Sequence, residues 1–506
     1  MFITPLGHTE CLIEIPNNKN ELVRILVDSW FSDVCVGDLM ARRERVRFDY
    51  DTLPKIDYIF ISHSHLDHLD PYFLTEFFRY QSPTLLIPET CQFVVDILKK
   101  YLPEVKAMIM RNNEKIQKDG VTIEGVIWSS NDVGNEEDVM TLFVSNSESM
   151  VYHEIDTKTP FNESERQLLE KKITPHRGKS LLLIESGNEI ETQLRSLETI
   201  KMSERGDIVK NAEEIWSEKI SEEWQYLHDY ELYDPRYESC VTRAWIGQGI
   251  TVPREIDEGL SNFHPLPLSR IASVESQTLK GQKLPKSSFA LLPGKRYELM
   301  KNSGLKEIPT IKSIKVELYK TKADYKHLGF LERLPGPALV SQREEYINDD
   351  ILLELINHRF LPFGLASAND PLKAAILSSN DHRYRIAFKT RNGDIIAVYG
   401  FSWATGKYAR EEKIVEISRI SEIYFLDDIA DFLEGKQELY SVFVHEMQRG
   451  KSYRLWNILG ANFINTDLLV KKYSYHFERA KQGWNNKELN EELLEIYQRK
   501  IKVIKK

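Results

Sequence analysis

Residues 62–70 read SHSHLDHLD and concentrate side chains that bind metal ions. Three of the chain's 13 histidines, His63, His65 and His68, fall within six positions, together with Asp67. Neutral imidazole and carboxylate oxygen are ligands that proteins use for zinc, iron and manganese. A single histidine in a polar loop would more simply face solvent, but this density of ligand types predicts a metal-binding loop.

The segments on either side place this loop at the end of a strand. Residues 56–62 (IDYIFIS) are typical of a buried strand, and residues 71–78 (PYFLTEFF) are typical of a helix. In α/β proteins, ligands bind outside the carboxyl ends of the strands. Because no regular period separates side chains in a loop, residues 63 and 65 can converge on one ion while residues 67 and 68 turn toward a second.

The first 160 residues alternate short strands with helices. The segments FITPL, CLIEI and RILVDSW, separated by turn residues, predict an antiparallel meander at the start. Further strands are predicted at TLLIP and VKAMIM, with an amphipathic helix at CQFVVDILKKYL between them. This order predicts an α/β fold, a sandwich of sheets with helices outside.

A chain of 506 residues is too long for one hydrophobic core. We predict a first domain over residues 1–300, with a charged helical insertion at about 162–237, and a second, α+β domain over residues 301–506. The turn sequence RNGD predicts a hairpin in the C-terminal domain. This domain is expected to serve substrate binding or dimerisation, so a homodimer is one expected state.

Composition and charge narrow the class of protein. The formal net charge is −10, with Lys and Arg scattered along the chain, which argues against nucleic acid as a partner. The four cysteines form no CxxC pair, so neither a disulfide framework nor a thiolate metal cluster is expected. No apolar run approaches the ~20 residues needed to span a bilayer, and the first residues lack the features of a signal peptide. We expect a cytoplasmic protein, without a membrane partner, that acts on a small molecule.

The loop motif and the segments before it resemble a known superfamily. HSHLDH matches the HxHxDH signature of the metallo-β-lactamase superfamily, and ITPLGHTECLIEI and ILVDSWF resemble the opening strands of its lactonase-like branch. The resemblance implies an αββα sandwich in which His63 and His65 bind one metal and Asp67 and His68 bind a second. It also implies that Asp28, with His8, lies just outside the ligands and orients them.

Two further ligands are implied by later segments. SMVYHEIDTKTP is similar to the strand end that carries a metal-bridging aspartate, which makes Asp156 the candidate, and NFHPLPLSR makes His264 the candidate for the last histidine. His153 competes for the bridging position, but its offset of three residues in a strand would point it to the other face. Because the insertion lies between Asp156 and His264, we predict that it acts as a lid over the metal loop.

The chain departs from the superfamily pattern at one position. Most members place a third histidine of the first metal between the HxHxDH loop and the bridging aspartate, but residues 113–149 contain no histidine. A replacement ligand would come from Asp132, Asn135, Glu136 or Asp138, or would be missing. A harder ion such as iron or manganese, or a single ion, would then suit the site.

The segment from Asn131 to Pro160 also resembles the CMP-N-acetylneuraminate hydroxylase-like branch, whose members use a Rieske cluster in the same chain. Such a cluster needs cysteines and histidines in CxH and CxxH spacing, which this sequence lacks. An oxygenase of this kind would therefore need an external reductase as its electron donor.

Three functions follow from these observations. The first is a metal-dependent hydrolase, with one or two zinc ions, in which a metal-activated water attacks an ester, lactone, amide or phosphodiester and Asp67 orients or accepts the proton. The second is an iron-dependent oxygenase acting on a sugar nucleotide or related metabolite. The third is a catalytically degenerate binding protein. Metal analysis separates the first two, and retained binding with no loss of activity in a variant with His63→Ala and His65→Ala would favour the third.

Overall fold

The computed structural model describes the following residues: 1–32, 41–65, 67–128, 139–157, 163–176, 178–186, 241–247, 249–251, 256–257, 260–261, 268–280, 288–301, 304–319, 385–389, 395–402, 407–411, 422–425, 444–447 and 466–483.

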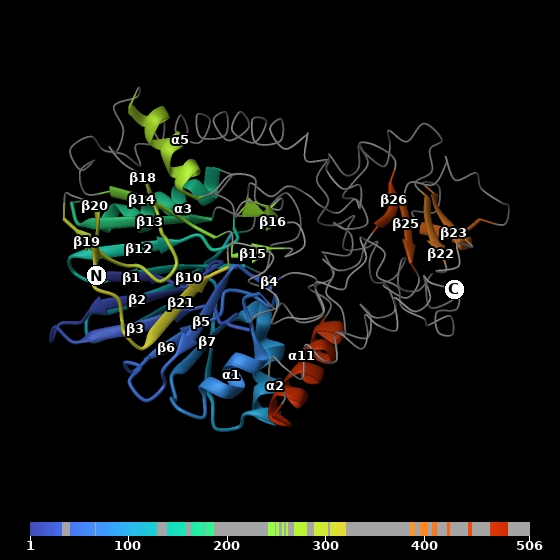
Figure 1. The fold of residues 1–506 in the computed structure, drawn as a ribbon, viewed down its shortest axis with the longest axis horizontal. Coiled ribbons are helices and arrows are strands. Elements are labelled where there is room, and N and C mark those ends of the chain that lie inside the picture. Colours follow the sequence, from blue (N-terminus) through green and yellow to red (C-terminus); the bar gives the residue numbers. More distant parts are fainter. Residues whose placement is uncertain are drawn as a thin grey trace.

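Two large sheets form the centre of the described fold (Figure 1). The first sheet has the order β20-β19-β1-β2-β3-β6-β7-β8. Its strands are β1 (Phe2–Pro5), β2 (Cys11–Pro16), β3 (Leu22–Val27), β6 (Tyr58–Phe60), β7 (Thr84–Pro88), β8 (Lys106–Met110), β19 (Arg296–Met300) and β20 (Gly304–Ile308). The strands from β20 to β3 are antiparallel, as the predicted meander requires, and those from β3 to β8 are parallel.

The second sheet repeats this mixed plan in the order β18-β14-β13-β12-β11-β10-β9. Its strands are β9 (Lys115–Lys118), β10 (Val121–Ile127), β11 (Met140–Ser145), β12 (Ser149–His153), β13 (Ser180–Ser186), β14 (Val241–Ile246) and β18 (Ser288–Ala290). Strands β9 to β12 are antiparallel, and β12, β13, β14 and β18 are parallel.

Hydrophobic side chains fill the space between the sheets and the space outside the second sheet. The inner core joins residues of both sheets, such as Ile13 and Ile25 of the first and Leu142 and Leu182 of the second. A second cluster packs the other face of the second sheet against α3 (Glu163–Ile173) and α5 (Leu268–Lys280). The predicted α/β sandwich with helices outside is therefore confirmed.

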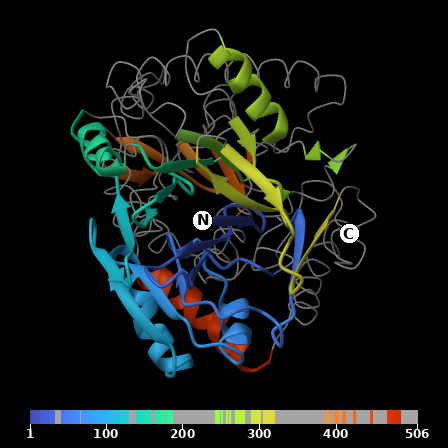
Figure 2. The same cartoon turned by 90° about the vertical axis from the view of Figure 1, so that its left-hand side faces the viewer.

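Helices also accompany the parallel half of the first sheet. They are α1 (Pro71–Phe77) and α2 (Gln92–Tyr101), which follow β6 and β7, and α11 (Thr466–Lys481), which packs against both of them (Figures 1 and 2). The amphipathic helix predicted at CQFVVDILKKYL is confirmed as α2. No sequence pattern had indicated that a helix from the C-terminal region would lie here.

Smaller elements complete the described chain. They are β4 (Ala41–Arg42), β5 (Glu44–Phe48), β15 (Ile250–Thr251), β16 (Ile256–Asp257), β17 (Leu260–Ser261), β21 (Ile314–Leu318), β22 (Arg385–Lys389), β23 (Ile395–Ser402), β24 (Lys407–Arg410), β25 (Glu422–Phe425), β26 (Val444–Met447) and two short 3-10 helices, η1 (Glu89–Cys91) and η2 (Thr174–His176). Strands β22 and β23, which flank RNGD in the sequence, pair antiparallel, which confirms the predicted hairpin. They belong to a separate five-stranded sheet, β24-β23-β22-β25-β26.

Elements on both sides of residue 300 contribute to the sandwich. Strand β20 extends the first sheet, β21 pairs with β5, and α11 packs on α1 and α2. The division at residue 300 remains a prediction, as does the lid. Within the predicted insertion, α3 packs on the outer face of the second sheet, and residues 187–237 lie outside the described residues.

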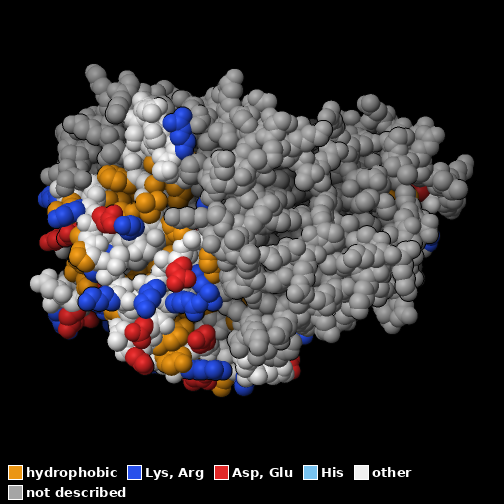
Figure 3. Space-filling view, viewed as in Figure 1, with side chains coloured by type: hydrophobic (Ala, Val, Ile, Leu, Met, Phe, Trp, Pro, Cys, Tyr) orange, Lys and Arg blue, Asp and Glu red, His pale blue; other side chains and the backbone are white. Residues whose placement is uncertain are grey.

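The visible face of the sandwich carries charges of both signs. Lys and Arg side chains alternate with Asp and Glu over the described part of this face, among hydrophobic side chains (Figure 3). In the described residues, no helix is long and apolar enough to cross a membrane.

Candidate metal centre

The histidine-rich loop lies where its flanking elements were expected to place it, between β6 and α1. Asp70 ends the loop and caps the helix, because its Oδ1 accepts hydrogen bonds from the backbone N–H groups of Tyr72 and Phe73. Its Oδ2 accepts from the N–H of Ser32, at 2.9 Å, which ties the loop to the segment that follows β3. Pro71 takes the first helical position, where the backbone N–H that proline lacks would have no partner within the helix. Asp70 therefore shapes the loop.

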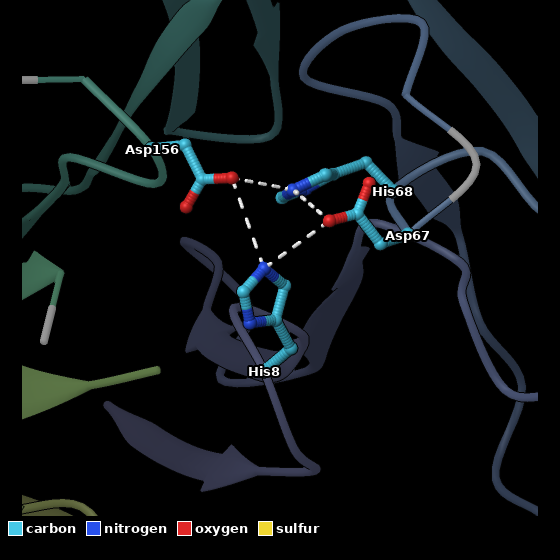
Figure 4. A group of neighbouring side chains, drawn as sticks. All are labelled: His8, Asp67, His68 and Asp156. Atoms are coloured by element: carbon cyan, nitrogen blue, oxygen red, sulfur yellow. Dashed lines mark ion pairs between the residues drawn. The ribbon is translucent and has the colours of Figure 1, made fainter. Parts of the chain in front are cut away.

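Three buried side chains and one partly exposed side chain, from three separate segments, meet beside this loop (Figure 4). They are His8, Asp67, His68 and Asp156, and one ligand atom of each lies within 4.8 Å of the others. His8 Nε2 is 3.6 Å from Asp67 Oδ2 and 3.8 Å from Asp156 Oδ2. His68 Nε2 is 3.8 Å from Asp67 Oδ2 and 2.6 Å from Asp156 Oδ2. The group lies at one edge of the sandwich, where β1, β6 and β12 end.

This donor set fits a single divalent ion. Ligand atoms about 2.0–2.2 Å from a tetrahedral ion lie roughly 3.4 Å from one another. Three of the four distances given above, at 3.6, 3.8 and 3.8 Å, are close to this value. The fourth, between His68 and Asp156, is shorter because the two side chains pair directly as imidazolium and carboxylate. Two imidazoles and two carboxylates suit zinc, iron or manganese.

Asp28 orients His68 from behind. Its Oδ2 lies 2.8 Å from His68 Nδ1 and accepts a hydrogen bond from Thr9 Oγ1 at 3.2 Å, while its Oδ1 accepts from the N–H of Ser62 at 2.8 Å. A carboxylate on Nδ1 keeps the proton there and turns Nε2 toward the group. The backbone of Asp28 has φ +57°, a left-handed conformation that aspartate tolerates better than most residues. This bend brings the carboxylate from the end of β3 under the loop.

His63 and His65 lie next to His68. The ring centroid of His63 is 4.3 Å from that of His65 and 4.0 Å from that of His68. Ser62 Oγ lies 2.8 Å from His63 Nδ1, whereas the buried Nε2 of His63 has no hydrogen-bond partner. A buried ring nitrogen without a partner is unfavourable, unless an ion occupies the position that it faces.

The charges of the group favour a cation. Burial opposes a charge on His68, but the carboxylates of Asp156 and Asp28 outweigh it and hold the pKa of His68 well above its usual value. The pKa of His8 is also raised: burial lowers it, but the carboxylates of Asp156 and Asp67 together raise it by more. Burial raises the pKa of Asp156, but His68 and His8 bring it well below the usual range. Burial, with the neighbouring His68 and His65, keeps the pKa of His63 low, so this ring is neutral, as a metal ligand has to be.

The loop that carries His8 is packed tightly from two sides. A β-carbon on Gly7 would lie 2.1 Å from Arg42 Nη2, and one on Gly249 would lie 2.2 Å from the backbone nitrogen of His8. The buried Arg42 donates from Nη2 to the carbonyl oxygen of Leu6 at 2.9 Å and lies 3.4 Å from the buried carboxylate of Glu10. Burial raises the pKa of Glu10 to about 7. Arg42 was not predicted to take part, because nothing in the sequence around it indicates that it reaches this loop.

The turn that carries Asp156 is strained. Ile155 has φ +64°, which is unusual for a β-branched residue, and its side chain is fully buried in the core between the sheets. This conformation turns the chain out of β12 and aims Asp156 at His68. Left-handed β-branched residues cost about 1–3 kcal/mol and occur where the surrounding structure holds them, often at functional sites.

His153 is not one of the four residues of the group, and it supports the loop that carries His8. Its Nδ1 accepts from the N–H of Ile155 at 3.1 Å, so its proton is on Nε2, which donates to the carbonyl oxygen of Thr9 at 3.0 Å. Both ring nitrogens are therefore used by the backbone. From the sequence, the offset of three residues from Asp156 had also ranked His153 below Asp156 for the bridging position.

We expect His153 to make stability depend on pH. Burial lowers its pKa from 6.5 to about 4, so between these values the unfolded chain binds a proton that the folded chain does not. Its contribution is present above pH 6.5 and is lost as the pH falls toward 4, by about 3 kcal/mol in all. Urea unfolding of the EDTA-treated protein at pH 4.5 and 7.5 measures this loss. In His153→Gln, which keeps a donor toward Thr9, the loss is expected to be smaller, and equal losses would contradict the assignment.

Five of the residues singled out from the sequence are not placed by the structure. Asp132, Asn135 and His264 lie outside the described residues, as do Glu136 and Asp138, so their roles remain predictions. His8 was expected just outside the ligands, whereas the geometry puts its Nε2 among the candidate donors.

The fold and the site together define an α/β protein with two stacked sheets and a cluster of His and Asp at one edge. Residues 23–174 match the family described as the beta-lactamase superfamily domain, so this part of the chain is a domain of that superfamily. The resemblance drawn from HSHLDH is thereby confirmed.

A curated relative and several solved structures are similar to the chain. A protein of Mycolicibacterium smegmatis whose name describes it as a Rieske 2Fe-2S iron–sulfur protein is 30% identical over 86 residues, 17% of this chain. That match spans 16% of the relative's length. A structure described as a metal-dependent hydrolase from Veillonella parvula has a TM-score of 0.36 and 12% identity, and the match covers 59% of this chain and 99% of that one.

Two other structures share shorter stretches. CmlA, a diiron beta-hydroxylase from Streptomyces venezuelae, has a TM-score of 0.28 and 16% identity, over 37% of this chain and 34% of that one. The metallo-beta-lactamase fold protein YhfI from Bacillus subtilis has a TM-score of 0.24 and 16% identity, over 37% of this chain and 70% of that one.

Proposed function

We propose that this protein is a metal-dependent hydrolase of an ester, lactone, amide or phosphodiester. The observation that carries the proposal is the convergence of His8, Asp67, His68 and Asp156 into one largely buried group with the spacing of metal ligands. The superfamily of residues 23–174 consists mostly of metal-dependent hydrolases, with some oxygenases, which supports the same class of reaction.

The four side chains differ in their exposure to solvent. The two imidazoles are almost wholly buried, at 2% and 0% side-chain exposure, whereas Asp67 and Asp156 are 12% and 15% exposed. The open side of the group is therefore its carboxylate side, and substrate is expected to approach from there. A zinc-type ion held here would activate a water molecule near neutral pH and polarise the carbonyl or phosphoryl oxygen of the substrate.

Asp67 is the residue that we assign to proton transfer. Its Oδ2 faces His8 and His68, at 3.6 and 3.8 Å, and its carboxylate is accessible from the open side. It can orient the attacking water and hold the proton that this water loses. Asp28 keeps the Nε2 of His68 directed at the same point, which maintains the geometry during the reaction.

An iron-dependent oxygenase is the second candidate. The 86-residue match to a protein named for a Rieske cluster supports it, as does the resemblance of residues 131–160 to the hydroxylase-like branch. The sequence has no CxH and CxxH pair of its own, so electrons would come from a separate reductase. Iron would fit the carboxylate-rich group described above.

Metal analysis with an activity assay tests the proposal. We expect purified protein to hold one tightly bound zinc ion per chain, at the group of His8, Asp67, His68 and Asp156. A second ion at His63 and His65 is expected to be lost first on dialysis. Hydrolysis of bis(p-nitrophenyl) phosphate or a p-nitrophenyl ester should disappear with a chelator and return with zinc.

Bound iron, with turnover of substrate only when a reductant and oxygen are supplied, would establish the oxygenase instead. Absence of any metal would favour a degenerate binding protein.

A further inference from the structure

A helix from the far end of the described chain packs beside the metal loop. Helix α11 lies against α1 and α2 in both views of the fold (Figures 1 and 2). Tyr473 and Phe477 on its inner face are fully buried. The ring centroid of Tyr473 is 5.9 Å from that of Phe93, and the ring centroid of Phe477 is 6.4 Å from that of Tyr101. This helix is thus part of the layer that covers the parallel half of the first sheet.

The hydroxyl of Tyr473 reaches the metal loop itself. It donates a hydrogen bond to the backbone carbonyl oxygen of Ser64, across a sequence separation of 409 residues. Ser64 is 1% exposed and stands between His63 and His65. Its carbonyl belongs to the peptide that joins Ser64 to His65, so the orientation of this peptide sets the directions of the two imidazoles relative to each other.

A second contact ties the same helix to the end of the loop. The hydroxyl of Tyr72 lies 3.2 Å from Nδ1 of the buried His476, one helical turn beyond Tyr473. Tyr72 is the second residue of α1, and its N–H is held by the capping carboxylate of Asp70. Helix α11 therefore contacts the loop in its middle, at Ser64, and the first turn of α1, at Tyr72, two residues after the loop ends.

We propose that Tyr473 is a positioning residue for the metal centre and that the centre is complete only when α11 is packed on α1 and α2. The proposal rests on the proposed function only in taking residues 62–68 as a metal-binding loop. It assigns to the C-terminal region a contribution to metal affinity that is separate from any contact with substrate. Outer partners of metal ligands contribute about 10- to 100-fold to affinity, and a hydrogen bond to the backbone between two ligands is expected at the lower end.

The test compares two tyrosines of the same helix in the full-length protein. Tyr473→Phe removes only the hydroxyl that donates to the Ser64 carbonyl. Tyr475→Phe removes the hydroxyl of a partly exposed ring, over which the Arg479 guanidinium lies. We expect cobalt(II) to bind Tyr473→Phe about 10-fold more weakly than wild type, with an altered visible spectrum. Tyr475→Phe should match wild type in both. Equal affinities and spectra in all three proteins would overturn the proposal.

Two further measurements keep the outcome interpretable. If Tyr473→Phe is not folded at 25 °C by circular dichroism, Tyr72→Phe takes its place, because it breaks the other attachment of α11 and should also weaken cobalt binding. An unchanged cobalt affinity in that variant would overturn the proposal. If wild type itself binds no cobalt, the proposed function fails; if wild type binds and Tyr473→Phe binds equally well, only the role of α11 fails.

Discussion

Asp156→Ala is expected to abolish the tightly bound ion and to lower kcat/KM for hydrolysis by about 1,000-fold, equivalent to about 4 kcal/mol. Asp156 Oδ2 is the atom nearest to His68 Nε2, at 2.6 Å, and it is also 3.8 Å from His8 Nε2. Its removal leaves two buried imidazoles facing each other with one carboxylate fewer to balance a cation. Alanine is chosen because asparagine would still offer an oxygen ligand.

Zinc content after dialysis and steady-state hydrolysis measure this effect. Asp96→Ala is the matched control, because Asp96 lies on α2 with 73% of its side chain exposed and pairs with Lys99 on the surface. It should retain full zinc content and activity. If Asp156→Ala also keeps its zinc and its activity, the metal centre does not lie at this group.

Asp28→Asn is expected to weaken metal binding by 10- to 100-fold, about 1.4–2.7 kcal/mol, without removing any ligand. The carboxylate Oδ2 accepts the Nδ1 proton of His68 at 2.8 Å. In the variant, the amide NH2 group can donate to Nδ1 only if Nδ1 has lost its proton. This favours the tautomer with the proton on Nε2, which blocks the nitrogen that should bind the ion. The wild-type carboxylate also makes His68 a better electron donor.

Titration with a competing chelator measures this affinity, and Thr9→Val provides a graded comparison. The Thr9 hydroxyl contacts the same oxygen at 3.2 Å, so its loss leaves the carboxylate in place and should weaken binding by less than Asp28→Asn does. The opposite order of the two variants, or wild-type affinity in Asp28→Asn, would show that Asp28 only stabilises the fold.

Much of the sandwich could be predicted because its strands and helices are local patterns. TLLIP and SLLLIES are strands β7 and β13 with the bounds that their apolar runs suggest, and the helix after HSHLDHLD begins at Pro71, after a capping aspartate. Helix α11 was missed although its sequence contains no helix breaker. Its buried face is completed by α1 and α2, far away in the sequence, so no local pattern shows where it packs.

The candidate site divides in the same way. His63, His65, Asp67 and His68 were found from the sequence because a single loop holds them. The strained turn at Ile155 and the packing of Arg42 against the loop of His8 could not be found, since each depends on contacts between distant segments.

The sequence by itself determined the class of fold and the set of imidazoles and carboxylates in one loop that predicts a metal site. Those properties depend on side-chain chemistry and on spacings of a few residues. Only the tertiary structure decided that His8 joins Asp67, His68 and Asp156, and that Tyr473 bonds to Ser64. Such meetings depend on how two sheets stack and which helix covers them, which the summed burial of many distant side chains determines.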